Sequence, residues 1–168
     1  MLEFGCDNEN ITQNCQDVPF VVSVSDTPDN ELIVVIALSK RGEKGEGSDE
    51  TDVPGLESLL QKAYPVYEDT ENVYEIRFES YIIYQCRNES YTYMDDTEIR
   101  KGKYLILFEK SKFLEYYKSV ITDVDIGDWK KDRKHYGIYT ANHIIDVIAN
   151  KPPVITRVNG VSIWNKTK

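Results

Sequence analysis

Two short runs that are apolar at every position constrain the fold of this chain more than any other feature. They are LIVVIAL, residues 32–38, and YLILF, residues 104–108. A strand with one buried face alternates apolar and polar residues, whereas a fully apolar run is typical of a strand covered on both faces. Each run is therefore expected to lie inside a sheet with other elements packed against it.

Further segments have the composition of strands. Residues 19–25 and 31–39 are rich in β-branched residues, and the DTPDN between them favours a turn, so they are expected to pair as a hairpin. Residues 72–80 alternate apolar and charged side chains, as a half-exposed strand does. Near the end, Asn159-Gly160 between apolar runs predicts another hairpin, because both residues tolerate a positive φ.

Two segments predict helices. VPGLESLLQKA, residues 53–63, has apolar residues at helical spacing, which indicates a short amphipathic helix with one buried stripe at Leu56, Leu59, Leu60 and Ala63. Ser111 can cap a second helix. The apolar face of that helix would consist of Phe113, Leu114, Tyr117, Val120 and Ile121.

The sum of these elements is an α+β fold. Two short helices and about seven or eight strands, with helices following strands only twice, predict a mostly antiparallel sheet rather than repeated βαβ units. At 168 residues and 40% apolar content, one domain over residues 1–168 is expected. Residues 40–52 have three glycines and no apolar side chain, which predicts a mobile acidic loop, and residues 1–17 are expected as a flexible N-terminus.

The negative charge is concentrated in the first half of the chain. The net charge is −9, and residues 1–70 contain 15 acidic and 4 basic residues. An acidic surface repels nucleic-acid phosphates and attracts cationic partners, so a basic protein partner is favoured and nucleic acid is disfavoured. A surface that only keeps the chain dissolved accounts for the same charge.

Several function classes have no support in the sequence. No apolar stretch approaches the roughly 20 residues that cross a bilayer, and the acidic start is unlike a secretory signal, which predicts a cytoplasmic protein without a membrane partner. The three cysteines, Cys6, Cys15 and Cys86, are an odd number and lack C-x-x-C spacing, which argues against a disulfide framework or a zinc site. No nucleotide-binding, hydrolase or zinc-protease motif occurs, so no cofactor is expected. The cluster Asp95, Asp96 and Glu98 lacks the calcium-loop pattern, so no metal is expected either.

Both histidines lie in KHYGIYTANHIIDVI, residues 134–148. If this segment is a hairpin with its turn near Asn142, His135 and His143 lie too far apart to share a proton or a metal ion. If residues 143–150 form a helix, His143 and Asp146 become neighbours three positions apart. The β-branched residues favour the hairpin, in which both histidines are structural.

Six residues are predicted to contact a protein partner. Strand alternation in residues 81–93 places Arg87 and Glu89 on one face, and Cys86 on the core face with Ile82 and Tyr84. Tyrosine is enriched in protein interfaces, and all twelve tyrosines lie between Tyr64 and Tyr139. The predicted contact residues are Arg87, Glu89, Tyr91, Tyr93, His135 and Tyr139.

The patterns YIIYQCRNESYTYMDD and KHYGIYTANHIIDVI, with KSKFLEYYKS between them, resemble a widespread bacterial family of small uncharacterised proteins. The resemblance covers residues 72–150 and implies an α+β bacterial domain in the cytoplasm, with no catalytic residues to carry over. Small acidic proteins of this type are similar in general character to immunity proteins, which neutralise a toxin.

Two functions from different classes follow. The first is a non-enzymatic protein-interaction domain, such as an immunity-type inhibitor, which could also form a homo-oligomer. The second is an enzyme that uses His135 or His143 with a nearby carboxylate. That enzyme requires a pocket in which an imidazole lies about 3 Å from an Asp or Glu.

Overall fold

The computed structural model describes residues 2–6, 18–47, 51–121 and 133–159. These residues form nine strands, two α-helices and a 3₁₀ turn at Glu89–Tyr91. The strands are β1 (Phe20–Asp26), β2 (Leu32–Arg41), β3 (Val66–Phe78), β4 (Tyr81–Asn88), β5 (Ile99–Lys101), β6 (Leu105–Lys110), β7 (Lys134–Tyr139), β8 (His143–Ala149) and β9 (Val154–Val158). The helices are α2 (Leu56–Leu60) and α3 (Lys112–Val120).

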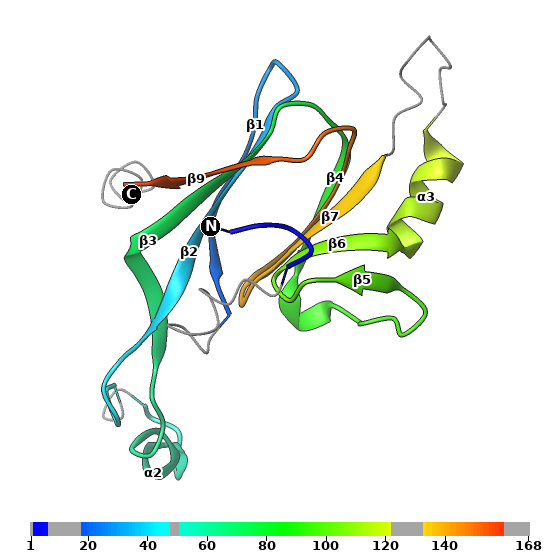
Figure 1. The fold of residues 1–168 in the computed structure, drawn as a ribbon. Helices are drawn as coiled ribbons and strands as arrows, with labels where there is room; N and C mark the ends of the chain where they lie inside the picture. Colours follow the sequence, from blue (N-terminus) through cyan, green and yellow to red (C-terminus); the bar gives the residue numbers. More distant parts are fainter. Residues whose placement is uncertain (1, 7–17, 48–50, 122–132, 160–168) are drawn as a thin grey trace.

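The strands form two antiparallel sheets. Sheet A has the order β1-β2-β3-β9, and sheet B has the order β4-β8-β7-β6-β5. Figure 1 shows the sheets facing one another, with α3 on the side of sheet B that faces away from sheet A. The predicted single α+β domain with antiparallel pairing is confirmed, with nine strands instead of seven or eight.

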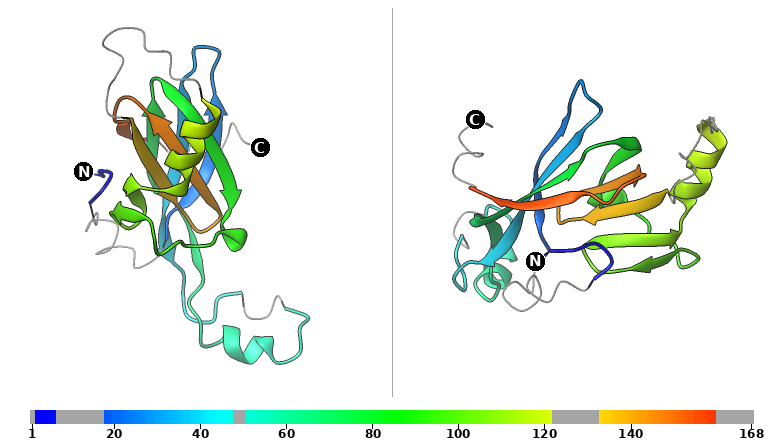
Figure 2. Two further views of the ribbon diagram at one scale, coloured as in Figure 1. Left: turned by 90° about the vertical axis from the view of Figure 1, so that its right-hand side faces the viewer. Right: turned by 45° about the horizontal axis from the view of Figure 1, so that its top comes forward.

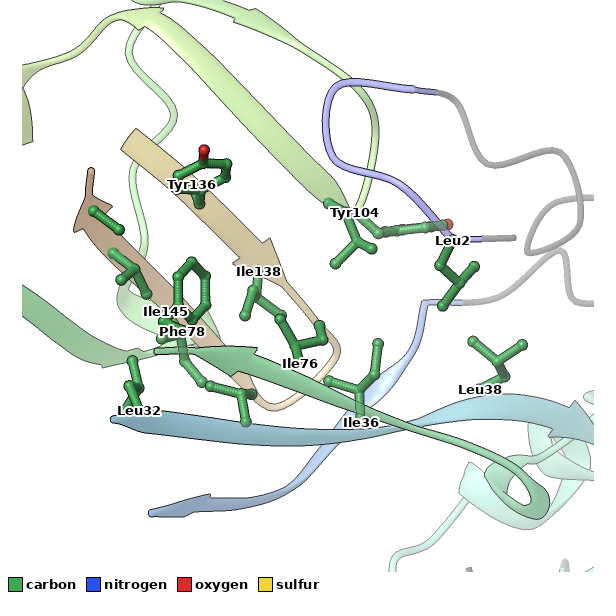
Figure 3. Close-up of a cluster of buried hydrophobic side chains, with 14 residues drawn as sticks. Leu2, Leu32, Ile36, Leu38, Ile76, Phe78, Tyr104, Tyr136, Ile138 and Ile145 are labelled. Atoms are coloured by element: carbon green, nitrogen blue, oxygen red, sulfur yellow. The ribbon is translucent and has the colours of Figure 1, made fainter. Parts of the chain in front are cut away.

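The main core lies between the two sheets. Alternate residues of β2 and β3 point toward sheet B, and alternate residues of β7 and β8 point back toward them (Figure 3). The contributors that are fully buried include Leu32, Val34, Ile36, Ile76, Ile138, Ile145 and Val147. In the N-terminal segment, Leu2 is buried in this core and Phe4 packs edge-on against Phe78 and Tyr136.

Both fully apolar runs are covered on two faces. The outer face of β2 contributes Val35 and Ala37 to a second cluster with Val73 of β3. In β6, Leu105 faces the main core, whereas Ile106 and Phe108 pack on the outer face of sheet B. Neither run alternates because neither strand has a solvent-facing side.

The two sheets are joined where the chain passes directly from one to the other. Only Glu79 and Ser80 separate β3 of sheet A from β4 of sheet B, and residues 150–153 return the chain from β8 to β9. The views in Figure 2 show this corner and the opening of the sheets away from it. Strands β4 and β8 pair with each other, as do β3 and β9, so the corner is fixed by pairing on both sides.

The turn between β7 and β8 ties the opposite end of sheet B to sheet A. The Asn142 side chain accepts a hydrogen bond from the Val21 backbone N–H and donates one to the Val21 carbonyl, both at 2.9 Å. Ala141 N–H donates to the Pro19 carbonyl at 2.9 Å. The pairing of β1 has a register irregularity between Val21 and Ser23. The Asn142 side chain supplies hydrogen-bond partners to the backbone groups of Val21 at this irregularity.

The structure departs from the sequence-based expectations in three places. Helix α2 has no buried residue, so the predicted buried stripe is wrong. The extended segment predicted over residues 81–93 ends at Asn88, just before the 3₁₀ turn, and β5 forms farther along, where the sequence indicates no strand. Two further predictions lie partly outside the described residues. The hairpin expected at Asn159-Gly160 extends into residues 160–168, and the flexible N-terminus includes residues 7–17.

Replacement of Asn142 tests the contact between the sheets. Asn142→Ala leaves the Val21 backbone groups without their partner, so we expect the free energy of unfolding to fall by about 1–3 kcal/mol in urea titrations. Asn150→Ala is the matched control, because the Asn150 Oδ1 atom has no hydrogen-bond partner. Equal losses in both variants would contradict the role of Asn142.

Candidate functional site

A cavity of about 340 Å³ lies on the outer face of sheet B, beside the start of α3. Its walls come from three sources: strands β4, β7 and β8, helix α3, and the segment between β4 and β5. The lining residues are Gln85, Arg87, Tyr93, Asp95, Glu98, Lys112, Phe113, Tyr116, His135, Tyr139 and Asp146.

Strand alternation and register bring the inner polar residues of the cavity together. Asp146 in β8 is the cross-strand partner of Gln85 on one side and of Gly137 on the other. Two positions along the neighbouring strands, Arg87 and His135 lie on the same face and diagonal to Asp146, within reach of long side chains. The carboxylate therefore lies at the centre of the polar group.

Every oxygen of Asp146 has a hydrogen-bond partner. Oδ1 lies 3.0 Å from Nε2 of His135, and Oδ2 accepts bonds from Gln85 Nε2 at 2.9 Å and from Arg87 at 2.7 Å. The other ring nitrogen of His135, Nδ1, lies 2.8 Å from Oγ of Ser111. Asp146 is 1% exposed, and Ser111 and His135 are each 2% exposed, so the chain Ser111–His135–Asp146 is buried throughout.

The hydrogen-bond pattern assigns the proton of a neutral His135. A carboxylate only accepts, so Nε2 carries the proton, and Nδ1 then accepts from the Ser111 hydroxyl. Ser111 Oγ also accepts the backbone N–H of Leu114 at 3.1 Å, which makes it the N-cap of α3. Both nitrogens of the ring and the serine oxygen are therefore occupied within the protein.

Aromatic packing fixes the orientation of the His135 ring. The ring stacks on Phe108, with centroids 4.1 Å apart and an angle of 8°, and meets Phe113 edge-on at 5.3 Å. Gly137 provides the space beside it, because a Cβ atom at Gly137 would lie 2.9 Å from the rings of Phe108 and Tyr139. This glycine is needed for the close approach of rings rather than for a turn.

Charges around the cavity shift the pKa values of two groups in opposite senses. Burial alone would raise the pKa of Asp146, but the hydrogen bond from His135, the charge of Arg87 and the hydrogen bond from Gln85 together lower it below its usual value. Burial, together with the charge of Asp146, raises the pKa of Tyr139 to about 12. Asp146 is therefore a carboxylate and Tyr139 a neutral phenol at physiological pH.

The rim of the cavity is more exposed than its floor. Lys112 forms an ion pair with Asp95, and its backbone N–H donates to Glu98 at 2.9 Å. Tyr93 and Tyr116 stand at this rim with 81% and 53% of their surfaces exposed. The rim thus offers aromatic surface to a molecule outside the chain, whereas Asp95 and Glu98 are already bonded to Lys112.

Four of the six residues predicted to contact a partner line this cavity: Arg87, Tyr93, His135 and Tyr139. The other two, Glu89 and Tyr91, lie in the exposed 3₁₀ turn and not on the cavity wall. His143 lies on the other face of β8 from Asp146, so the helical pairing of these two residues does not occur.

The interpretation of Cys86 as a core thiol is wrong, because this residue is exposed. It lies near the end of β4, which among the described strands pairs with β8 alone and so forms an edge of sheet B. A register irregularity between Tyr81 and Ile83 also separates Ile82 from the face of Tyr84: Ile82 packs against the α3 cluster and Tyr84 against the main core.

Sequence reasoning missed Ser111, Gln85 and the pairing of His135 with Asp146. A signal for that pairing was present: Asp146 is a charged residue within the run IIDVI, and a carboxylate among buried residues needs donors. Continuing the hairpin register outward from Asn142 places His135 diagonal to Asp146. Ser111 was identified only as a helix cap, a role that it has in the structure.

Comparison of the chain with protein-family models, with curated proteins and with solved structures found no match. The resemblance to a bacterial family therefore stays a prediction. In the part of the chain that the structure describes, no helix is long and apolar enough to cross a membrane. In the same part, no three His, Cys, Asp or Glu side chains are grouped to hold a metal ion.

Asp146→Asn tests the charge at the centre of the cavity. We expect a loss of roughly 1.5–3 kcal/mol in the free energy of unfolding at neutral pH, because charged hydrogen bonds to His135 and Arg87 are weakened. The folded pKa lies below the ordinary value of 3.8, so the carboxylate stabilises the fold above that value and this stabilisation is lost as pH falls through the folded pKa.

Urea titrations from about pH 7 down to about pH 3 measure this dependence. The variant should lose less stability on acidification than the parent chain. Glu109→Gln is the control, because it removes an ion pair with Lys101 in which both side chains are exposed, so it should cost less at neutral pH. An acid dependence unchanged in Asp146→Asn would show that the carboxylate does not carry the predicted stabilisation.

Proposed function

We propose that this chain is a non-enzymatic protein-interaction domain, and that the cavity beside α3 and its rim recognise a basic protein partner. The observation that carries the proposal is the burial of the Ser111–His135–Asp146 chain, in which Ser111 and His135 are each 2% exposed and Asp146 is 1% exposed. The same hydrogen bonds occur in the triad of a serine hydrolase, so burial is what favours a stabilised floor of a binding pocket over a catalytic site.

The position of Ser111 supports the same conclusion. A serine nucleophile must reach the substrate, but Ser111 is 2% exposed and is not part of the cavity wall. Its oxygen also holds the first turn of α3 through Leu114.

The composition of the cavity suits a positively charged group on a protein partner. Three carboxylates and two cationic side chains line the cavity, a net charge of −1, and Asp146 and Asp95 are already paired with Arg87 and Lys112. Tyr93 and Tyr116 supply large exposed rings, which anchor protein interfaces and attract cations. The acidic first half of the chain would steer a basic partner toward this protein.

An immunity-type inhibitor of a toxin is the specific member of this class that we favour. Such a protein acts by occupying the surface of its partner and needs no reactive group. A bacterial, cytoplasmic setting belongs to the same proposal, and it rests on the sequence resemblance alone.

Two exposed tyrosines provide a matched test. Tyr93 lines the cavity, whereas Tyr91, which is 89% exposed, does not. With the full chain as bait in lysate of the cells that produce it, Tyr93→Ala should reduce capture of the partner by about tenfold or more. Tyr91→Ala should retain most of the capture. Raised salt should weaken capture of the partner by the unaltered chain. Capture of no protein above background at low salt would sink the proposal.

A second candidate, a hydrolase that uses His135 and Asp146, is favoured by one observation. The 3.0 Å approach of His135 Nε2 to Asp146 in a cavity wall is the geometry that an enzyme of this kind requires. With Ser111 at 2.8 Å from Nδ1, the chain has the residue types of acyl-transfer enzymes.

A fluorophosphonate reagent, which reacts with activated serines, distinguishes the two candidates. We expect the folded chain to remain unlabelled at Ser111, because the hydroxyl is buried and hydrogen-bonded. Mass spectrometry of the treated protein gives the readout. Labelling of Ser111 that disappears in His135→Ala, with the fold of that variant retained, would favour the enzyme and overturn the binding proposal.

A further inference from the structure

Strands β2 and β3 extend beyond the sandwich as a two-stranded arm. Beyond Ala37, the pairing continues from Leu38 with Asp69 to Arg41 with Val66. The described residues at its end, 42–47 and 51–65, include α2. Figure 1 shows the arm leaving sheet A, and Figure 2 shows α2 well separated from both sheets. We refer to residues 38–47 and 51–69 as the β2–β3 arm.

Hydrogen bonds and a cation–π contact hold the end of the β2–β3 arm together. Gly42 N–H donates to the Pro65 carbonyl at 2.8 Å, and Gly45 N–H donates to the Ala63 carbonyl at 2.9 Å. The Arg41 guanidinium lies 5.0 Å from the centre of the Tyr64 ring. The arm therefore presents its side chains in a defined arrangement without a core of its own.

Leu38, at the base of the β2–β3 arm, is buried in the main core, but most of the apolar side chains beyond Ser39 are exposed. None of the five residues of α2 is buried, and Leu59 is 65% exposed. Val53, Tyr64, Tyr67 and Val66 are exposed by 59%, 48%, 39% and 37%. A helix this short has little stability without burial of its apolar face, which makes this surface suited to completion by another molecule.

We propose that the apolar face of α2, with Val53 and Tyr64, docks into an apolar groove on a basic protein. The β2–β3 arm contains six acidic and four basic residues, so it complements a groove with a basic rim. A second copy of this chain, at a net charge of −9, would bring like charges together. Anionic lipid and nucleic acid are repelled for the same reason. The inference rests on the proposed function and adds a second contact surface to it.

The test places a photo-cross-linking side chain on the arm of the full-length chain. Leu59→p-benzoylphenylalanine in the producing cells should cross-link one protein of net positive charge, and Val154→p-benzoylphenylalanine should not. Val154 is a suitable control because it is similarly exposed, at 49%, but lies on β9. Cross-links from position 59 to another copy of this chain or to lipid, or no cross-link at all, would overturn the proposal.

Affinity for the cross-linked protein, once purified, gives the second readout. Leu59→Ser should weaken binding by about tenfold or more, whereas Val154→Ser should leave it unchanged. Because α2 buries no residue within the chain, Leu59→Ser should not change thermal unfolding.

The two proposals fail in different ways. Full affinity of Leu59→Ser, with binding that still depends on Tyr93, overturns the arm alone. Failure of the unaltered chain to capture any protein overturns the proposed function and, with it, the arm.

Discussion

A buried carboxylate, Asp146, is the interaction on which the outer face of sheet B depends. An ionised group in an apolar interior is costly unless charged and polar donors compensate it. Here the donors come from both neighbouring strands: Gln85 and Arg87 from β4, and His135 from β7. A slip of β8 by one residue would replace the carboxylate with an apolar side chain, so the same bonds specify the register of three strands.

The interaction also couples the sheet to the helix that covers it. His135 is hydrogen-bonded to Ser111, and Ser111 caps the start of α3 by accepting the backbone N–H of Leu114. The helix then buries Phe113 and Tyr117 against Ile148 of β8. The start of α3, and with it one wall of the cavity, is therefore positioned by the residues that a catalytic interpretation would otherwise use. This contrast between a closed floor and an open rim is the basis of the proposed binding role.

The fold was largely predictable from local patterns, because hydrophobic periodicity and turn residues act over short distances. The DTPDN turn, the Ser111 cap and the strands around Asn142 all appear where the sequence indicates them. The division into two sheets was not predictable in this way. It depends on which edges pair over long separations, as when β3 meets β9 and β4 meets β8.

The candidate site was predictable only in part. Arg87, Tyr93, His135 and Tyr139 were identified by residue type, and the cavity gathers them because their strands pair. Two errors have one physical origin. Cys86 and the stripe of α2 were assigned to the interior from the spacing of apolar residues along a strand and a helix, but such a face is buried only where another element covers it. The local sequence does not show which element packs against a given face.

The state of the His135 ring tests the central claim most directly. Nitrogen-15 NMR of the imidazole reports which nitrogen carries the proton and how fast that proton exchanges with water. The account predicts a slowly exchanging proton on Nε2 and an Nδ1 that accepts a hydrogen bond from Ser111. A rapidly exchanging ring proton, or a ring nitrogen whose signal changes when a small cavity-binding molecule is added, would contradict a closed polar chain and favour a reactive site.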